Sequence, residues 1–115
     1  MRKLEVYRNG ILAGTLIEVN RQHFVFSYDE NYFSDINLPA ISLTFPKNKK
    51  EFRSPFLFPF FFNMLSEGVN RKLQSSQFRI DEKDNFGLLM ATAQNDTIGA
   101  VTVQIIDRAN MKNIS

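Results

Sequence analysis

Hydrophobic and polar positions alternate along the first part of the chain. Leu4 and Val6, and then the apolar residues between Ile11 and Ile17, flank the pair Asn9-Gly10. Asn-Gly tolerates the positive φ angles that the tight turn of a β-hairpin requires. Residues 3–18 are therefore predicted to form two antiparallel strands.

Two further short strands are expected before the pattern changes. His23–Tyr28 alternates aromatic residues with Val25 and Ser27, a composition that favours a strand. The polar residues 29–31 would end it. Ile41–Phe45 lies between two prolines, so it is predicted to be a short strand near an edge of the sheet, followed by a polar loop.

The apolar period changes to that of a helix from about Pro55. Every three or four positions an apolar residue falls on one helical face, with an interruption expected near Gly68. The residues on this face are Phe61, Leu65, Val69 and Leu73. A helix is therefore predicted after residue 55.

A second helix and a last strand complete the pattern. Asp84 suits the N-cap of a helix that runs to about Ala93, and residues 95–97 would turn the chain into a strand over Ile98–Ile106. The predicted fold class is α+β: a small, largely antiparallel sheet of about four or five strands, packed by two or three helices on one face.

Length and composition agree with one domain. The chain has 115 residues, of which 43% are hydrophobic and 23% charged, and the net charge is +2. We expect a single domain over residues 1–108 and a tail over 109–115. The apolar stretch Phe56–Leu65 is interrupted by Pro59 and is shorter than the about twenty residues that span a membrane. No signal-peptide core follows Met1-Arg2-Lys3, which favours a cytoplasmic protein.

The sequence contains few of the residue types and motifs that catalysis requires. The sequence has no cysteine and a single histidine, His23, so no histidine pair could bind a metal. No glycine-rich loop precedes a lysine and a serine or threonine, as phosphate binding would require. Asp29 and Glu30 are more typical of a solvated turn than of an acid and base pair. We therefore predict a protein that is not an enzyme, without catalytic residues, cofactor or metal.

Several short motifs, taken in order, resemble the N-terminal subdomain of the HipA serine/threonine kinase family over roughly residues 4–106. They are Val6–Gly10 with Gly14–Leu16, Phe26–Asp29, Leu38–Pro46, Phe60–Gly68, and Asp84–Leu89 with Asp96–Val101. Three positions depart from the family pattern: Ser66 replaces a usual proline, Gln94 a usual glycine, and Phe62 a residue that is commonly polar.

The resemblance implies a partner rather than a reaction. In HipA kinases several hundred residues with the ATP site follow this subdomain, whereas nine residues follow Ile106 here. The arrangement is similar to HipBST toxin–antitoxin systems, where a small HipS-type antitoxin corresponds to this subdomain and the HipT kinase is separate. The resemblance thus implies an antitoxin that neutralises a HipT-like serine/threonine kinase. The alternatives are a structural or activating subunit of the kinase, and a DNA-binding accessory in a complex with a HipB-like protein.

Two segments could supply the binding residues. Five of the 12 phenylalanines fall within residues 56–62, and exposed aromatic clusters mark partner surfaces when they are not packed in the core. A helical wheel places Phe60 on the polar side, whereas the family resemblance indicates Phe62, which we favour. The predicted kinase-binding residues are Phe58, Phe60, Phe62, Asn63, Ser66 and Glu67.

The second segment is basic. Lys47, Lys49, Lys50 and Arg53 lie within seven residues, so they form either a solvated loop or a contact to phosphate groups of a nucleic acid or a phosphorylated kinase segment.

Overall fold

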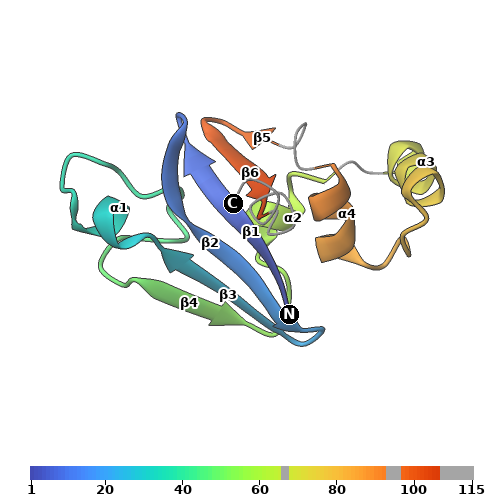
Figure 1. Cartoon of the computed structure of the whole chain (residues 1–115), viewed down its shortest axis with the longest axis horizontal. Coiled ribbons are helices and arrows are strands. Elements are labelled where there is room, and N and C mark those ends of the chain that lie inside the picture. Colours follow the sequence, from blue (N-terminus) through green and yellow to red (C-terminus); the bar gives the residue numbers. More distant parts are fainter. Residues whose placement is uncertain (66–67, 93–96, 107–115) are drawn as a thin grey trace, which may run out of the picture.

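The computed structural model describes residues 1–65, 68–92 and 97–106, which form one antiparallel sheet and four helices (Figure 1). The strands are β1 (Arg2–Arg8), β2 (Ile11–Asn20), β3 (His23–Tyr28), β4 (Glu51–Ser54), β5 (Thr97–Ile98) and β6 (Val101–Ile105). The helices are α1 (Glu30–Ser34), α2 (Pro59–Phe62), α3 (Gly68–Phe78) and α4 (Asn85–Ala91). The strand order is β4-β3-β2-β1-β6-β5. The predicted α+β class is confirmed.

The hairpin of β1 and β2 forms as expected from its turn. Asn9 and Gly10 have φ angles of 50° and 78°, and Arg8 pairs with Ile11 across the turn. The turn is also attached to the other end of the chain, because the Asn9 amide donates to the carbonyl of Ala100 at 2.9 Å. This hydrogen bond lies at the end of the antiparallel pair of β1 and β6, and β6 comes more than ninety positions later in the chain.

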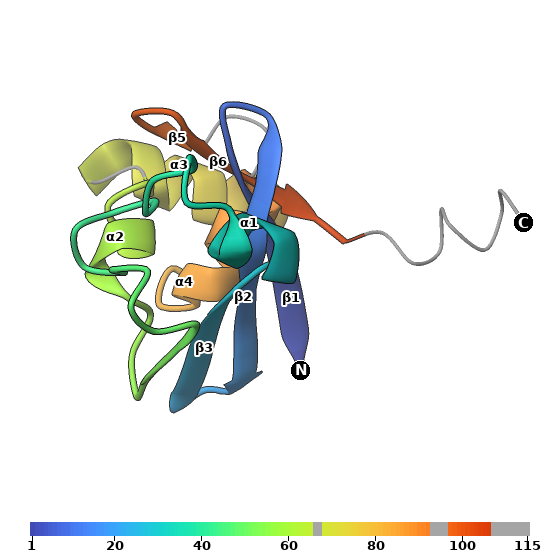
Figure 2. The same cartoon turned by 90° about the vertical axis from the view of Figure 1, so that its left-hand side faces the viewer.

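One face of the sheet carries the core. Figure 2 shows α2 and α4 on the same side of the central strands. Alternate side chains of the strands point toward these helices and are buried, as the period of two in a strand requires. The largest of the fully buried side chains include Leu4, Leu16, Phe26, Tyr28, Phe61, Phe86 and Leu89. Phe26 occupies the centre, with its ring centroid 4.8 Å from that of Phe45 and 5.8 Å from that of Phe61.

The predicted strand at Ile41–Phe45 is wrong. The segment is a loop, and the edge strand is instead β4, in which Phe52 pairs with Phe26 of β3. The reason is a buried side chain: the hydroxyl of Tyr28 donates to the carbonyl of Phe45 and accepts from the amide of Ile41 at 3.1 Å. A tyrosine thus satisfies backbone groups that a strand would have paired with its neighbour.

The predicted helix after residue 55 is two helices. α2 ends at Phe62 and α3 begins at Gly68, so residues before and after this interruption do not share one helical face. Leu73, expected on the buried face, is 61% exposed. Figure 1 shows α3 at the edge of the molecule, beside α4 and away from the sheet.

Other elements match or extend the prediction. Asp84 is the N-cap of α4, since its carboxylate accepts a hydrogen bond from the Gly87 amide at 3.0 Å. The expected last strand is divided by a turn at Gly99, whose φ is 57°, into β5 and β6. α1 was not expected; Asp29 caps it by accepting from the amides of Asn31 and Tyr32. The turn predicted at Asn95 and Asp96 lies outside the described residues.

Candidate partner-binding surface

The phenylalanine cluster divides into buried and exposed rings. Phe58 is only 8% exposed and Phe61 is fully buried. Phe60 is partly buried, with its ring centroid 6.0 Å from that of Phe45 and 5.2 Å from that of Phe61. The rings of Phe58 and Phe60 therefore pack against the core and are less exposed than those of Phe56 and Phe62. Phe56, in the loop before α2, is the most exposed ring of the cluster at 73%.

Phe62 and Asn63, which follow one another at the end of α2, are both exposed. The Phe62 ring is 37% exposed, and the guanidinium carbon of Arg71 lies 5.4 Å from the ring centroid, a cation–π geometry. Asn63 is the C-cap of α2. Ser66 and Glu67, the other two predicted binding residues of this segment, lie outside the described residues.

Arg71 joins three segments around Phe62. From α3, its Nε and Nη2 atoms donate to the carbonyl of Glu82 at 3.2 and 3.1 Å, and Nη2 also donates to the side-chain carbonyl of Asn85 at the start of α4. A fork of donors held by two acceptors leaves the guanidinium few orientations. The Arg71 guanidinium is therefore held in a defined position beside the Phe62 ring.

We call the resulting area the Phe62 surface. It is a shallow hollow of about 480 Å³, and its residues are Phe62, Arg71, Asp81, Glu82, Lys83 and Asn85. It combines one aromatic ring, a guanidinium and charges of both signs. Aromatic and arginine side chains are the types most often found among residues that dominate protein–protein binding.

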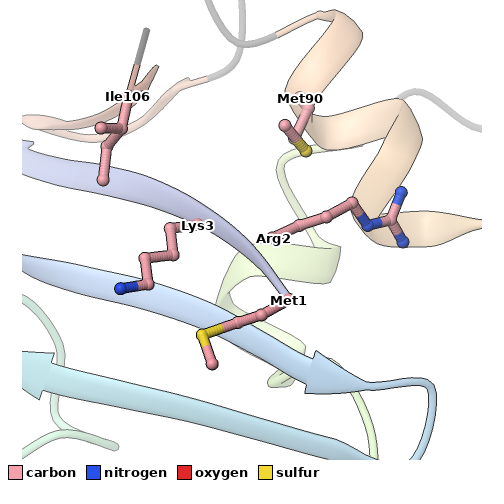
Figure 3. Close-up of a pocket in the computed structure, with 5 residues that line it drawn as sticks. All are labelled: Met1, Arg2, Lys3, Met90 and Ile106. Carbon is pink, nitrogen blue, oxygen red and sulfur yellow. The ribbon is translucent and has the colours of Figure 1, made fainter. Parts of the chain in front are cut away.

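A charge cluster anchors the loop that borders this surface. Arg2 donates to both carboxylate oxygens of Asp84 at 2.8 and 3.0 Å, and its Nε donates to Glu18 at 2.7 Å. Arg21 adds an ion pair to Asp84 at 2.9 Å. Figure 3 shows the Arg2 side chain extending from β1 toward α4. The hydrogen bonds from Arg2 hold the pKa of Asp84 below its ordinary value, and the Gly87 amide acts in the same direction.

An open hollow of about 460 Å³ lies at the start of β1, beside this cluster (Figure 3). Met1 and Lys3 come from the start of the chain, Met90 from α4, and Ile106 follows β6. The guanidinium of Arg2 also borders it but is engaged by Asp84 and Glu18. The hollow therefore combines the apolar side chains of Met1, Met90 and Ile106 with polar groups that include the Lys3 ammonium.

The basic segment does not gather its charges at one point. Lys47 donates to the carbonyls of Asp35 and Leu38, both at 2.7 Å, and Lys50 forms an ion pair with Glu30. Each ammonium is thus held by the segment around α1.

The other two basic residues contact β3 and β4. Arg53 pairs with Glu51 at 2.8 Å and its Nη1 lies 3.0 Å from His23 Nε2, whereas Lys49 lies 5.4 Å from the Phe52 ring centroid. The four predicted phosphate contacts are therefore distributed over different local partners.

Within residues 1–65, 68–92 and 97–106, no group of three or more histidine, cysteine, aspartate and glutamate side chains is placed to hold a metal ion. No helix of these residues is long and apolar enough to cross a membrane.

Sequence reasoning missed Arg71 and Asn85. Their roles depend on contacts 11 and 14 positions apart that form because α3 lies against the loop before α4. No local pattern marks such a pair. Phe62 was identifiable, because an aromatic residue at a commonly polar family position indicates an exposed ring.

The sheet and its helices form a small α+β domain that carries the Phe62 surface, and comparisons with known proteins agree with the fold. The sequence matches the HipA N-terminal domain family over residues 4–104, and the chain belongs to this family. A solved structure, the N-terminal domain of HipA toxin, is similar with a TM-score of 0.70 and 28% identity, covering 94% of this chain and 95% of that one.

A relative from Haemophilus influenzae (strain ATCC 51907 / DSM 11121 / KW20 / Rd), an uncharacterized protein, is 36% identical over 104 residues. These residues are 90% of this chain and 92% of the relative. That relative therefore consists almost entirely of this domain.

Proposed function

We propose that this chain binds a separate HipA-like kinase of the HipT type and neutralises it without chemistry of its own. The observation that carries the proposal is the family: the chain has the N-terminal domain of a kinase toxin over residues 4–104. In single-chain HipA kinases this domain accompanies the kinase in one polypeptide. A kinase that lacks the domain would therefore expose a surface complementary to it.

The Haemophilus influenzae relative supports the idea of a separate binding subunit. The shared region covers 92% of it, so a protein made of little more than this domain exists elsewhere. The family match is to the N-terminal domain of HipA and not to its kinase domain, which supports an effect on a kinase through binding.

The Phe62 surface supports a specific mode of docking. Its ring is exposed, and the guanidinium of Arg71 lies beside the ring and is ordered by contacts to Glu82 and Asn85. A side chain that is already ordered loses less conformational entropy on binding. We propose that Phe62 and Asn63 contact the kinase near its nucleotide cleft, and that Ser66 and Glu67 contribute to the same contact.

The basic segment gives less support to a DNA-binding role. Lys47 and Lys50 already contact carbonyl or carboxylate groups of the chain. A phosphate backbone would have to compete for these side chains. In a complex with a HipB-like protein, we therefore assign the DNA contacts to that partner.

Co-expression with a HipA-like kinase of the HipT type tests the proposal. We expect the two proteins to purify together and growth to recover relative to the kinase alone. Phe62→Ala should weaken binding about tenfold or more, as expected for a buried anchor. Asn63→Arg, which places a long charged side chain next to the ring, should weaken it as well.

Ile36→Ala is a matched control. Ile36 is 95% exposed and follows α1, which lies at the opposite end of the molecule from α3 (Figure 1). Unchanged binding for Phe62→Ala and Asn63→Arg would contradict the docking surface. Association without recovery of growth would indicate a structural or activating subunit, and no association would contradict the proposal.

A further inference from the structure

A third hollow lies where the loop before β4 meets β4 and the start of α2. Its buried part is aromatic: Phe45 and Phe58 are 2% and 8% exposed, and Phe52 and Phe60 are partly buried. Lys49 and Arg53 also border the hollow and are exposed, so they form its rim. It shares no residue with the Phe62 surface.

The hollow has the size of one apolar side chain. Its volume is about 170 Å³. A cavity of about 150 Å³ lined by apolar residues accepts a benzene molecule. The rings of Phe45, Phe52 and Phe58 pack edge to face, with the Phe45 centroid 5.1 Å from each of the other two. These contacts give the walls a fixed shape.

The rim favours negative charge. The Lys49 ammonium lies over the Phe52 ring, and no carboxylate of residues 1–65, 68–92 and 97–106 forms a salt bridge with it. Arg53 pairs with Glu51, but both side chains are about half exposed. Exposed pairs contribute little stability, so an incoming carboxylate can replace Glu51 at low cost.

We propose that this hollow binds an acidic peptide segment of a partner protein, in which a leucine- or phenylalanine-sized side chain is flanked by carboxylates. The apolar side chain enters the hollow that the rings of Phe45, Phe52, Phe58 and Phe60 line. The flanking carboxylates pair with Lys49 and Arg53. The proposal is independent of kinase neutralisation, because the site is complete within this chain.

The test uses the isolated protein, labelled with ¹⁵N, and three blocked peptides. The first has the sequence Asp-Glu-Leu-Asp-Glu, the second has alanine in place of leucine, and the third has lysine in place of each acid. The first peptide should shift the amide resonances of Phe45, Phe52 and Phe60. The alanine peptide should bind about tenfold or more weakly, because a buried leucine side chain is lost. The lysine peptide should produce no shifts.

Variants separate the two parts of the site. Lys49→Glu with Arg53→Glu should weaken binding at least about tenfold, and this loss should shrink as salt is added. Thr44→Trp keeps both charges but places a large ring at a position that lines the hollow, so it should block binding. Lys72→Glu, an exposed lysine of α3, is the matched charge control and should leave binding unchanged.

Thermal unfolding of each variant confirms that it is folded. Equal affinity for the leucine and alanine peptides would overturn the role of the hollow. Unchanged affinity after charge reversal, or shifts confined to other parts of the protein, would overturn the site as a whole.

Discussion

The guanidinium of Arg2 and the carboxylate of Asp84 form two parallel hydrogen bonds across 82 positions of the chain. Asp84 is also the N-cap of α4, so one carboxylate orders a helix terminus and attaches it to β1. The side chain of Asp84 is 11% exposed and that of Arg2 is 30% exposed. Fork-like pairing of this kind is stronger than a single charged contact.

Asp84→Ala should lower the free energy of unfolding by about 2 to 4 kcal/mol. The variant loses the cap of α4 and leaves the Arg2 guanidinium with Glu18 alone. Urea unfolding measures the change. Asp81→Ala removes a nearby exposed carboxylate and should cost less than about 1 kcal/mol. Equal losses for both variants would contradict the role of the Arg2 contact.

The Asp84 carboxylate should also make the free energy of unfolding depend on pH. Arg2 lowers the pKa of Asp84 in the folded protein below its ordinary value of 3.8. A group with a lowered folded pKa stabilises the fold above the unfolded pKa, and this contribution is lost as the pH falls through the folded pKa. The difference in unfolding free energy between the wild type and Asp84→Asn should therefore be constant above about pH 5 and shrink below pH 3.8. A difference that stays constant down to pH 2 would contradict the shift.

Tyr28→Phe should cost about 1 to 3 kcal/mol of stability. The hydroxyl of Tyr28 is the partner of the Ile41 amide and the Phe45 carbonyl, and Tyr28 itself is buried. Removing the hydroxyl leaves both the Ile41 amide and the Phe45 carbonyl without this partner. Tyr7→Phe is the control. The Tyr7 hydroxyl donates to the partly buried carboxylate of Glu5, and loss of this hydroxyl should cost less than about 0.5 kcal/mol. Hydrogen exchange at Ile41 should also be faster in Tyr28→Phe, and unchanged exchange would count against this explanation.

Gly14→Ala should destabilise the sheet by about 1 to 3 kcal/mol, as overpacking does. A Cβ atom at Gly14 would lie 2.3 Å from the carbonyl oxygen of Ser27 and 3.0 Å from the Phe26 ring. The first neighbour is backbone, which can move only by distorting the pairing of β2 with β3. Thermal unfolding tests this, with Ser34→Ala as an exposed control. A melting temperature unchanged by Gly14→Ala would show that the strands relax freely.

Local sequence patterns were sufficient for the strands β1, β2 and β3 and for the capped start of α4. In each case the determining interaction is between near neighbours: the Asn9-Gly10 turn, the alternation of residues 23–28, and the bond from Asp84 to the Gly87 amide. The order and identity of the motifs were also sufficient to identify the family. The turn, the alternating strand and the helix cap are each determined by interactions between residues only a few positions apart.

Contacts between distant segments decided the remaining features. Residues 41–45 have the composition of a strand, yet the hydroxyl of Tyr28 holds them as a loop and leaves the sheet edge to Glu51–Ser54. Phe58 and Phe62 are the same type of residue, but of the two only Phe62 is exposed, because Phe58 at the start of α2 packs against Phe45 and Phe61. Arg71 acquires its place beside Phe62 from the packing of α3 against the loop before α4. Burial of this kind depends on which surfaces meet after the chain has folded, and a linear pattern does not contain that information.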